Sequence, residues 1–70
     1  MEFSIGDQVF LASALPYLKT ADPMPMLRPP DLVSPEELGQ VIAIRANGNA
    51  EVRFHAGTFL VPFEKLQIKA

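Results

Sequence analysis

The sequence predicts an all-β protein on three observations: short apolar runs of alternating polarity, tight-turn signals between them, and one long proline-rich segment. Seventy residues support one domain, which we expect to span residues 1–70. The chain has no cysteine, so neither a disulfide nor a Cys/His zinc site is expected to stabilise it. Stability should therefore come from apolar packing, since 49% of the residues are hydrophobic.

The first half predicts one strand and a long loop. We expect the strand over residues 8–12, with Val9 and Leu11 on one face. Residues 14–38 show no sustained period and hold six of the seven prolines, which exclude regular helix or sheet over most of the stretch. We expect an ordered loop packed against the sheet, because the stretch carries eight large apolar side chains: Leu15, Tyr17, Leu18, Met24, Met26, Leu27, Leu32 and Val33. The run Ser34-Pro35-Glu36-Glu37 predicts one capped helical turn.

The second half predicts a meander. Strands are expected over residues 41–44, 51–54, 58–61 and 66–68, with a 3₁₀ turn over residues 62–65. Asn47-Gly48 and Ala56-Gly57 predict tight turns, and both Asn47 and Gly48 can take positive φ. This order is typical of a small SH3-like five-stranded barrel with a long proline-rich first loop and a 3₁₀ turn before the last strand. Alternation selects ten interior positions: Val9, Leu11, Val41, Ala43, Val52, Phe54, Leu60, Phe63, Leu66 and Ile68.

The sequence predicts no enzyme, no metal site and no cofactor. His55 is the only histidine, and no cysteine accompanies it, so we expect an ordinary surface residue at a strand end. Glu36 and Glu37 are better explained by the capped turn than by acid/base catalysis. The four glycines form neither a phosphate-binding loop nor a dinucleotide fingerprint.

Charge and hydropathy bear on nucleic-acid binding and on the cellular location of the protein. The net charge is −2 and the six cations are scattered, so nucleic-acid binding is not expected. We expect no signal peptide, because no basic region followed by an apolar run opens the chain, and no apolar run is long enough to span a membrane. We therefore expect a soluble, cytoplasmic protein without membrane insertion.

The proline-rich loop predicts a surface that binds a protein partner. Its prolines lower the entropy lost on ordering, its methionines adapt to a partner, and its apolar content exceeds what so small a protein can bury. Alternatively, these side chains fill the open end of the barrel. Ile42 and Ile44 should face outward, where we expect the loop to cover them; the alternative is that they form an exposed interface. Whether exposed strand edges pair into a weak homo-oligomer stays open. The partner-binding residues we predict are Tyr17, Leu18, Lys19, Asp22, Met24, Met26, Leu27, Arg28 and Phe59.

The segment from Tyr17 to Leu32 closely resembles the signature of the cyanobacterial SipA family of small regulatory proteins. The resemblance extends to a downstream pattern of Gly39, Val41, Val52-Arg53-Phe54, Gly57, Phe59-Leu60 and Leu66. It implies an SH3-like regulatory adaptor that binds the ATP-binding catalytic domain of the sensor histidine kinase NblS and stimulates its autophosphorylation in two-component stress signalling.

Two further function classes stay open. One is a small SH3-like structural subunit of a photosynthetic membrane complex, which cell fractionation would find with membranes. The other is a nucleic-acid-binding barrel of the ribosomal kind, whose mark would be strongly salt-dependent RNA binding. The acidic composition speaks against the latter.

Overall fold

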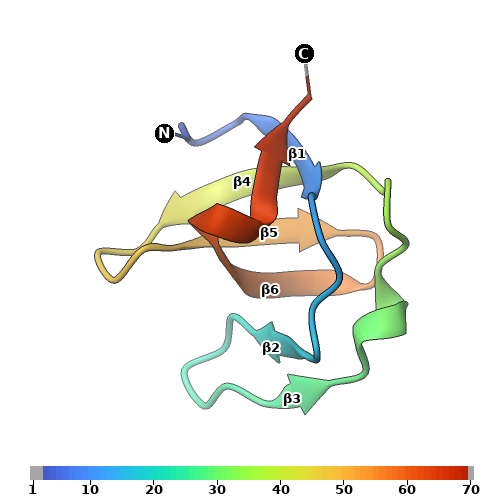
Figure 1. The fold of residues 1–70 in the computed structure, drawn as a ribbon. Helices are drawn as coiled ribbons and strands as arrows, with labels where there is room; N and C mark the ends of the chain where they lie inside the picture. Colours follow the sequence, from blue (N-terminus) through green and yellow to red (C-terminus); the bar gives the residue numbers. More distant parts are fainter. Residues whose placement is uncertain (1–2, 70) are drawn as a thin grey trace.

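The structure is a computed structural model that describes residues 3–69. Over these residues the chain forms one antiparallel sheet of seven strands in the order β3-β2-β6-β5-β4-β1-β7, without an α-helix (Figure 1). The strands are β1 (Gln8–Leu11), β2 (Leu18–Thr20), β3 (Leu27–Arg28), β4 (Gly39–Ile44), β5 (Asn49–Phe54), β6 (Gly57–Pro62) and β7 (Leu66–Ile68). Two 3₁₀ turns, η1 (Pro30–Leu32) and η2 (Phe63–Lys65), complete the described elements. The prediction of an all-β protein is confirmed.

The predicted meander is confirmed as β4-β5-β6, which forms the centre of the sheet. Val41 pairs with Val52 across β4 and β5, and Val52 pairs with Phe59 across β5 and β6. All three side chains are buried, so one face of the meander carries the core. The β4–β5 register shifts between Val41 and Ala43, which marks an irregularity of the kind that bends a strand.

The β4–β5 connection differs from the predicted two-residue turn. The Arg45 N–H donates to the carbonyl oxygen of Asn49 (2.8 Å), and the turn spans residues 45–48. Only Gly48 takes a positive φ, at 87°, and Asn47 does not. The prediction that both Asn47 and Gly48 could use positive φ is therefore not realised, because in this longer turn the left-handed conformation falls on one residue.

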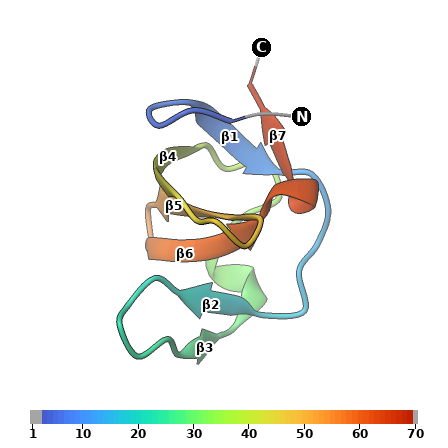
Figure 2. The same cartoon turned by 90° about the vertical axis from the view of Figure 1, so that its left-hand side faces the viewer.

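The first and last strands, β1 and β7, pair with each other (Figure 2). β1 lies between β4 and β7 and pairs Leu11 with Leu66. The predicted first strand extended to residue 12, but β1 ends at Leu11, and the Ala12 N–H donates to the carbonyl oxygen of Lys65 (2.7 Å). The 3₁₀ turn before the last strand is confirmed as η2, with Pro62 at its N-cap, and the last strand has the predicted bounds.

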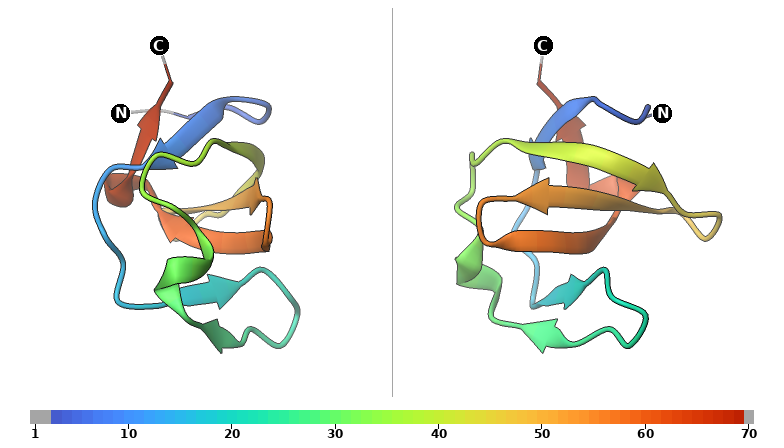
Figure 3. Two further views of the ribbon diagram at one scale, coloured as in Figure 1. Left: turned by 90° about the vertical axis from the view of Figure 1, so that its right-hand side faces the viewer. Right: turned by 180° about the vertical axis from the view of Figure 1, so that it is seen from behind.

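The proline-rich segment contains more sheet than predicted. β2 pairs with β6, and β3 pairs with β2, so the segment extends the sheet instead of lying beside it as a loop. Figure 3 shows this hairpin beyond β6, at the end of the molecule opposite β1 and β7. The strands are only three and two residues long and fit between the prolines, which therefore remain outside the ladder. The prediction of five strands was wrong for this reason.

The predicted helical turn at residues 34–37 is a simple turn. The Glu37 N–H donates to the carbonyl oxygen of Ser34 (3.1 Å), and the Ser34 N–H donates to Oε1 of Glu37 (3.2 Å). The Glu37 side chain therefore reaches back to the backbone of Ser34, as a capping box would, but no helix follows because β4 begins at Gly39.

The core confirms most, but not all, of the predicted interior. Among residues 3–69, twelve hydrophobic residues are buried: Phe3, Val9, Leu11, Leu18, Val33, Val41, Ala50, Val52, Phe54, Phe59, Val61 and Leu66. Of the predicted positions, Ala43, Leu60 and Phe63 are only partly buried and Ile68 is exposed. In β6 the predicted phase was wrong, because the β5–β6 register places Phe59 opposite Val52 and Val61 opposite Ala50, which turns Leu60 to the other face.

The sheet is not closed among the described residues, because β3 and β7 form its two edges. The Cα radius of gyration is 10.7 Å, close to the roughly 11 Å expected of a compact chain of this length.

Candidate binding surfaces

The β2–β3 hairpin is closed by the side chain and backbone of Thr20. The Thr20 N–H donates to the carbonyl oxygen of Met26 (2.9 Å), and the Met26 N–H donates back to Oγ1 of Thr20 (2.8 Å). The Ala21 N–H donates to the carbonyl oxygen of Thr58 in β6 (3.1 Å). The two Thr20–Met26 bonds define the base of the hairpin tip, residues 21–26, and the Ala21 bond attaches the hairpin to β6.

The hairpin presents four large apolar side chains to solvent. Met24 is 83% exposed, Leu27 64%, Met26 59% and Tyr17 48%. We call Tyr17, Met24, Met26 and Leu27 the hairpin surface. The predicted site residues Lys19, Asp22 and Arg28 are also exposed on the same hairpin. The expectation that the segment carries more apolar side chains than the core can bury is confirmed, because only Leu18 and Val33 of the eight are buried.

Two predicted partner-binding residues lie in the core instead. Leu18 is 0% exposed and Phe59 is 2% exposed. Leu18 is the inward residue at the start of β2, and the register of β6 turns Phe59 inward opposite Val52. Their side chains therefore pack in the core beneath the hairpin and are not exposed to a partner.

A small polar hollow of about 410 Å³ separates the hairpin tip from the β5–β6 turn. It brings together four predicted site residues, Asp22, Met26, Arg28 and Phe59. The other lining residues are Thr20, Ala56, Gly57 and Thr58. The hollow thus has one carboxylate and one guanidinium on its hairpin side, beside the methionine.

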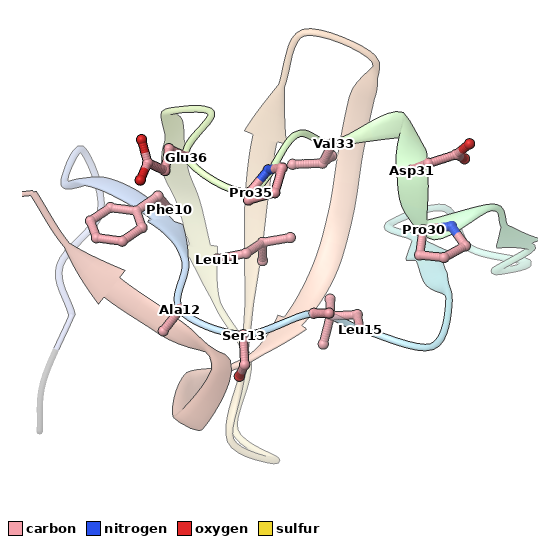
Figure 4. A pocket seen from close by; sticks show the side chains of 11 residues that line it. Phe10, Leu11, Ala12, Ser13, Leu15, Pro30, Asp31, Val33, Pro35 and Glu36 are labelled. Atoms are coloured by element: carbon pink, nitrogen blue, oxygen red, sulfur yellow. The ribbon is translucent and has the colours of Figure 1, made fainter.

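A larger groove of about 580 Å³ was missed by the sequence analysis (Figure 4). One wall is the end of β1 and the segment after it, and the other runs from η1 to the turn before β4. The lining residues are Phe10, Leu11, Ala12, Ser13, Ala14, Leu15, Pro30, Asp31, Val33, Pro35 and Glu36. The apolar character of both segments is readable in the sequence, but their opposition across a groove is a tertiary contact. We call this the β1–η1 groove.

The outer face of β4 is open. Ile42 is 37% exposed and Ile44 is 42% exposed. The expectation that the proline-rich segment covers these isoleucines was wrong, because that segment pairs at the edge of β6 and extends the sheet there.

Residues 3–69 contain no group of three or more His, Cys, Asp or Glu side chains placed to hold a metal ion. His55 is exposed in the β5–β6 turn, and its backbone N–H donates to Oε2 of Glu37 (3.0 Å). The Glu37 carboxylate therefore has a structural role, since it joins this turn to the Ser34 turn.

Over the same residues the fold has no helix whose length and apolar character would let it cross a bilayer.

Fold and surfaces together define a small all-β protein with one antiparallel sheet, an exposed apolar hairpin and two surface hollows. A family model described as Protein CHLORORESPIRATORY REDUCTION 42-like matches residues 5–66, and the chain belongs to this family. No curated protein matches the chain, and neither does any solved structure.

The family membership corrects the resemblance drawn from the sequence. The assignment to the SipA family was wrong, because the match over residues 5–66 is to a different family. The role as an adaptor in two-component signalling and the NblS-type histidine kinase as partner are withdrawn with it. The residues from Tyr17 to Leu32, on which the SipA assignment rested, are mostly exposed. Packing constrains the choice of exposed residues least, so such a segment is a weak guide to family.

Proposed function

We propose that the chain is a non-enzymatic, single-domain SH3-like subunit of a protein complex related to chlororespiration and photosynthesis. Its hairpin surface would dock on another protein of that complex. The family name supports the setting, and the single observation that supports docking is the set of exposed apolar side chains on the hairpin.

The strand pairing supports the SH3-like part of the proposal. β1 pairs with both β4 and β7. The next strands, β4, β5 and β6, form a meander, and η2 precedes the last strand. In SH3-like barrels the first strand likewise pairs with the last, and a long first loop precedes the meander. The β2–β3 hairpin occupies the position of that loop.

The hairpin suits docking because it is both apolar and held in shape. Thr20 closes its base, Ala21 bonds to β6, and the buried Leu18 anchors β2 in the core. A surface that is ordered before binding loses less entropy in the complex. Met24 and Met26 add unbranched side chains that adapt to a partner.

Leu27→Ser and Ile5→Ser form a matched pair for the test. Leu27 is 64% exposed and Ile5 is 68% exposed, so both substitutions remove a similarly exposed side chain. Each variant is expressed with a tag in photosynthetic cells, membranes are solubilised mildly, and the tagged chain is followed on native gels. Mass spectrometry identifies the proteins that migrate with it.

We expect the wild type and Ile5→Ser to migrate with subunits of a photosynthetic or chlororespiratory complex. Leu27→Ser should weaken the affinity by about tenfold, the effect of losing about 1.4 kcal/mol at one anchor residue, and so lower the fraction of chain bound. Equal reduction by both variants would remove the hairpin from the proposal. A wild-type chain that migrates free of any such complex would overturn the function itself.

A further inference from the structure

We propose that the β1–η1 groove binds an extended segment of a partner protein in which a bulky apolar residue is flanked by lysine or arginine. The inference goes beyond the proposed function, because it concerns a surface that shares no residue with the hairpin surface.

The lining of the groove is apolar along its length and acidic at its ends. In Figure 4 the side chains of Leu11, Val33 and Leu15 lie between the two walls. Glu36 lies at one end and Asp31 at the other (Figure 4). Both carboxylates point outward in this view, so they stand at the rim of the groove, where basic residues that flank the apolar side chain of the partner would meet them.

The charge of the groove is uncompensated within the described chain. None of its lining residues is a lysine or an arginine. Over residues 3–69 the one ion pair joins Arg45 to Glu51, so neither Asp31 nor Glu36 takes part in one. Carboxylates without internal partners favour a cationic ligand and disfavour an anionic one.

The backbone of the first wall favours an extended occupant. Over the described residues, no hydrogen bond joins the backbone of Ser13, Ala14 or Leu15 to the rest of the chain. An extended peptide can pair with such free N–H and C=O groups while its alternate side chains enter a pocket. The volume of about 580 Å³ lies within the range of roughly 300–1,000 Å³ typical of ligand pockets.

The test uses a synthetic eight-residue peptide with a central Leu-Leu pair, about two lysines on each side, and one glycine and one serine as its ends. Two control peptides replace either the lysines by glutamate or the leucines by serine. Amide shifts of the ¹⁵N-labelled full chain are followed during titration with each peptide at low salt.

We expect saturable shifts at Ser13, Ala14, Leu15 and Val33 with the basic apolar peptide, and none with either control peptide. The double variant Asp31→Lys with Glu36→Lys should weaken binding by at least about fivefold. Glu64→Lys is the matched control, because Glu64 is an exposed carboxylate outside the groove, and it should bind as the wild type does.

Three results would overturn the inference. One is the absence of shifts at millimolar peptide, and another is equal binding of the glutamate peptide. The third is that the amide signals of the groove residues shift with protein concentration in the absence of peptide, which would show that a second copy of the chain occupies the groove. None of these results bears on the Leu27→Ser experiment, so the two proposals fail independently.

Discussion

Gly39 lies directly against the ring of Phe54, and a Cβ at position 39 would stand 2.7 Å from Cε1 of that ring. A Cβ there would also stand 2.7 Å from Cγ1 of Val52. Both neighbours are buried, so neither side chain can move aside without disturbing the core. The first residue of β4, directly after the proline-rich segment, thus has no room for a side chain against β5.

Gly39→Ala should lower the free energy of unfolding by about 2 kcal/mol, the usual cost of overpacking a core. This is opposite in sign to the small gain that alanine brings where it fits. Urea denaturation followed by circular dichroism measures the change. Adding Phe54→Leu to Gly39→Ala should cost less than the sum of the two single changes, and strict additivity would show that the ring is not the obstacle.

Phe59→Ala should lower the free energy of unfolding by about 3–4 kcal/mol, as for other buried aromatic side chains. Leu60→Ala should cost less than half as much, because Leu60 is only partly buried. The comparison checks the facing of β6 directly. A larger loss at Leu60 than at Phe59 would mean that β6 has the phase the sequence predicts.

Glu37→Ala should lower the free energy of unfolding by about 1 kcal/mol, since it removes the acceptor of two backbone N–H groups, those of Ser34 and His55. Glu36→Ala is the control, because no side-chain hydrogen bond of Glu36 occurs within the described residues, and it should stay within about 0.5 kcal/mol of the wild type. Chemical denaturation of both variants gives the comparison, and equal losses would contradict a specific role for Glu37.

Thr20→Val should loosen the hairpin without unfolding the sheet. The substitution removes the Oγ1 acceptor of the Met26 N–H, so the Met26 amide should exchange with solvent about fivefold faster, as expected from losing about 1 kcal/mol. Thr58→Val, in the adjacent strand, should leave that rate unchanged. Hydrogen exchange followed by NMR measures both, and an unaltered Met26 rate in Thr20→Val would show that this bond does not hold the hairpin.

The alternating segments explain why so much of the sheet was predictable. Val52 and Phe54 alternate with the charged Glu51 and Arg53 and therefore predict their own facing, and Val9 and Leu11 follow the polar, exposed Gln8 at the same period. In β6 the run Phe59-Leu60-Val61 is continuously apolar, so its facing depends on its register with β5, which a local pattern does not contain.

The hairpin was missed for a related reason. β2 and β3 are too short to show any period, and they pair because β6 offers an edge about forty residues away along the chain. The apolar content of Met24, Met26 and Leu27 still indicated exposure correctly. The β1–η1 groove was beyond prediction, because it exists only where two segments of the chain face each other.

The two-residue edge strand β3 determines how this molecule can assemble. Pro25 and Pro29 stand close on either side of it and lack the N–H that an added strand would need. A strand of another chain could therefore form almost no backbone hydrogen bonds with this edge, even though exposed apolar side chains surround it. A partner docked at this end would contact side chains without extending the sheet, and the same property protects this edge from the strand-by-strand stacking that leads to fibrils.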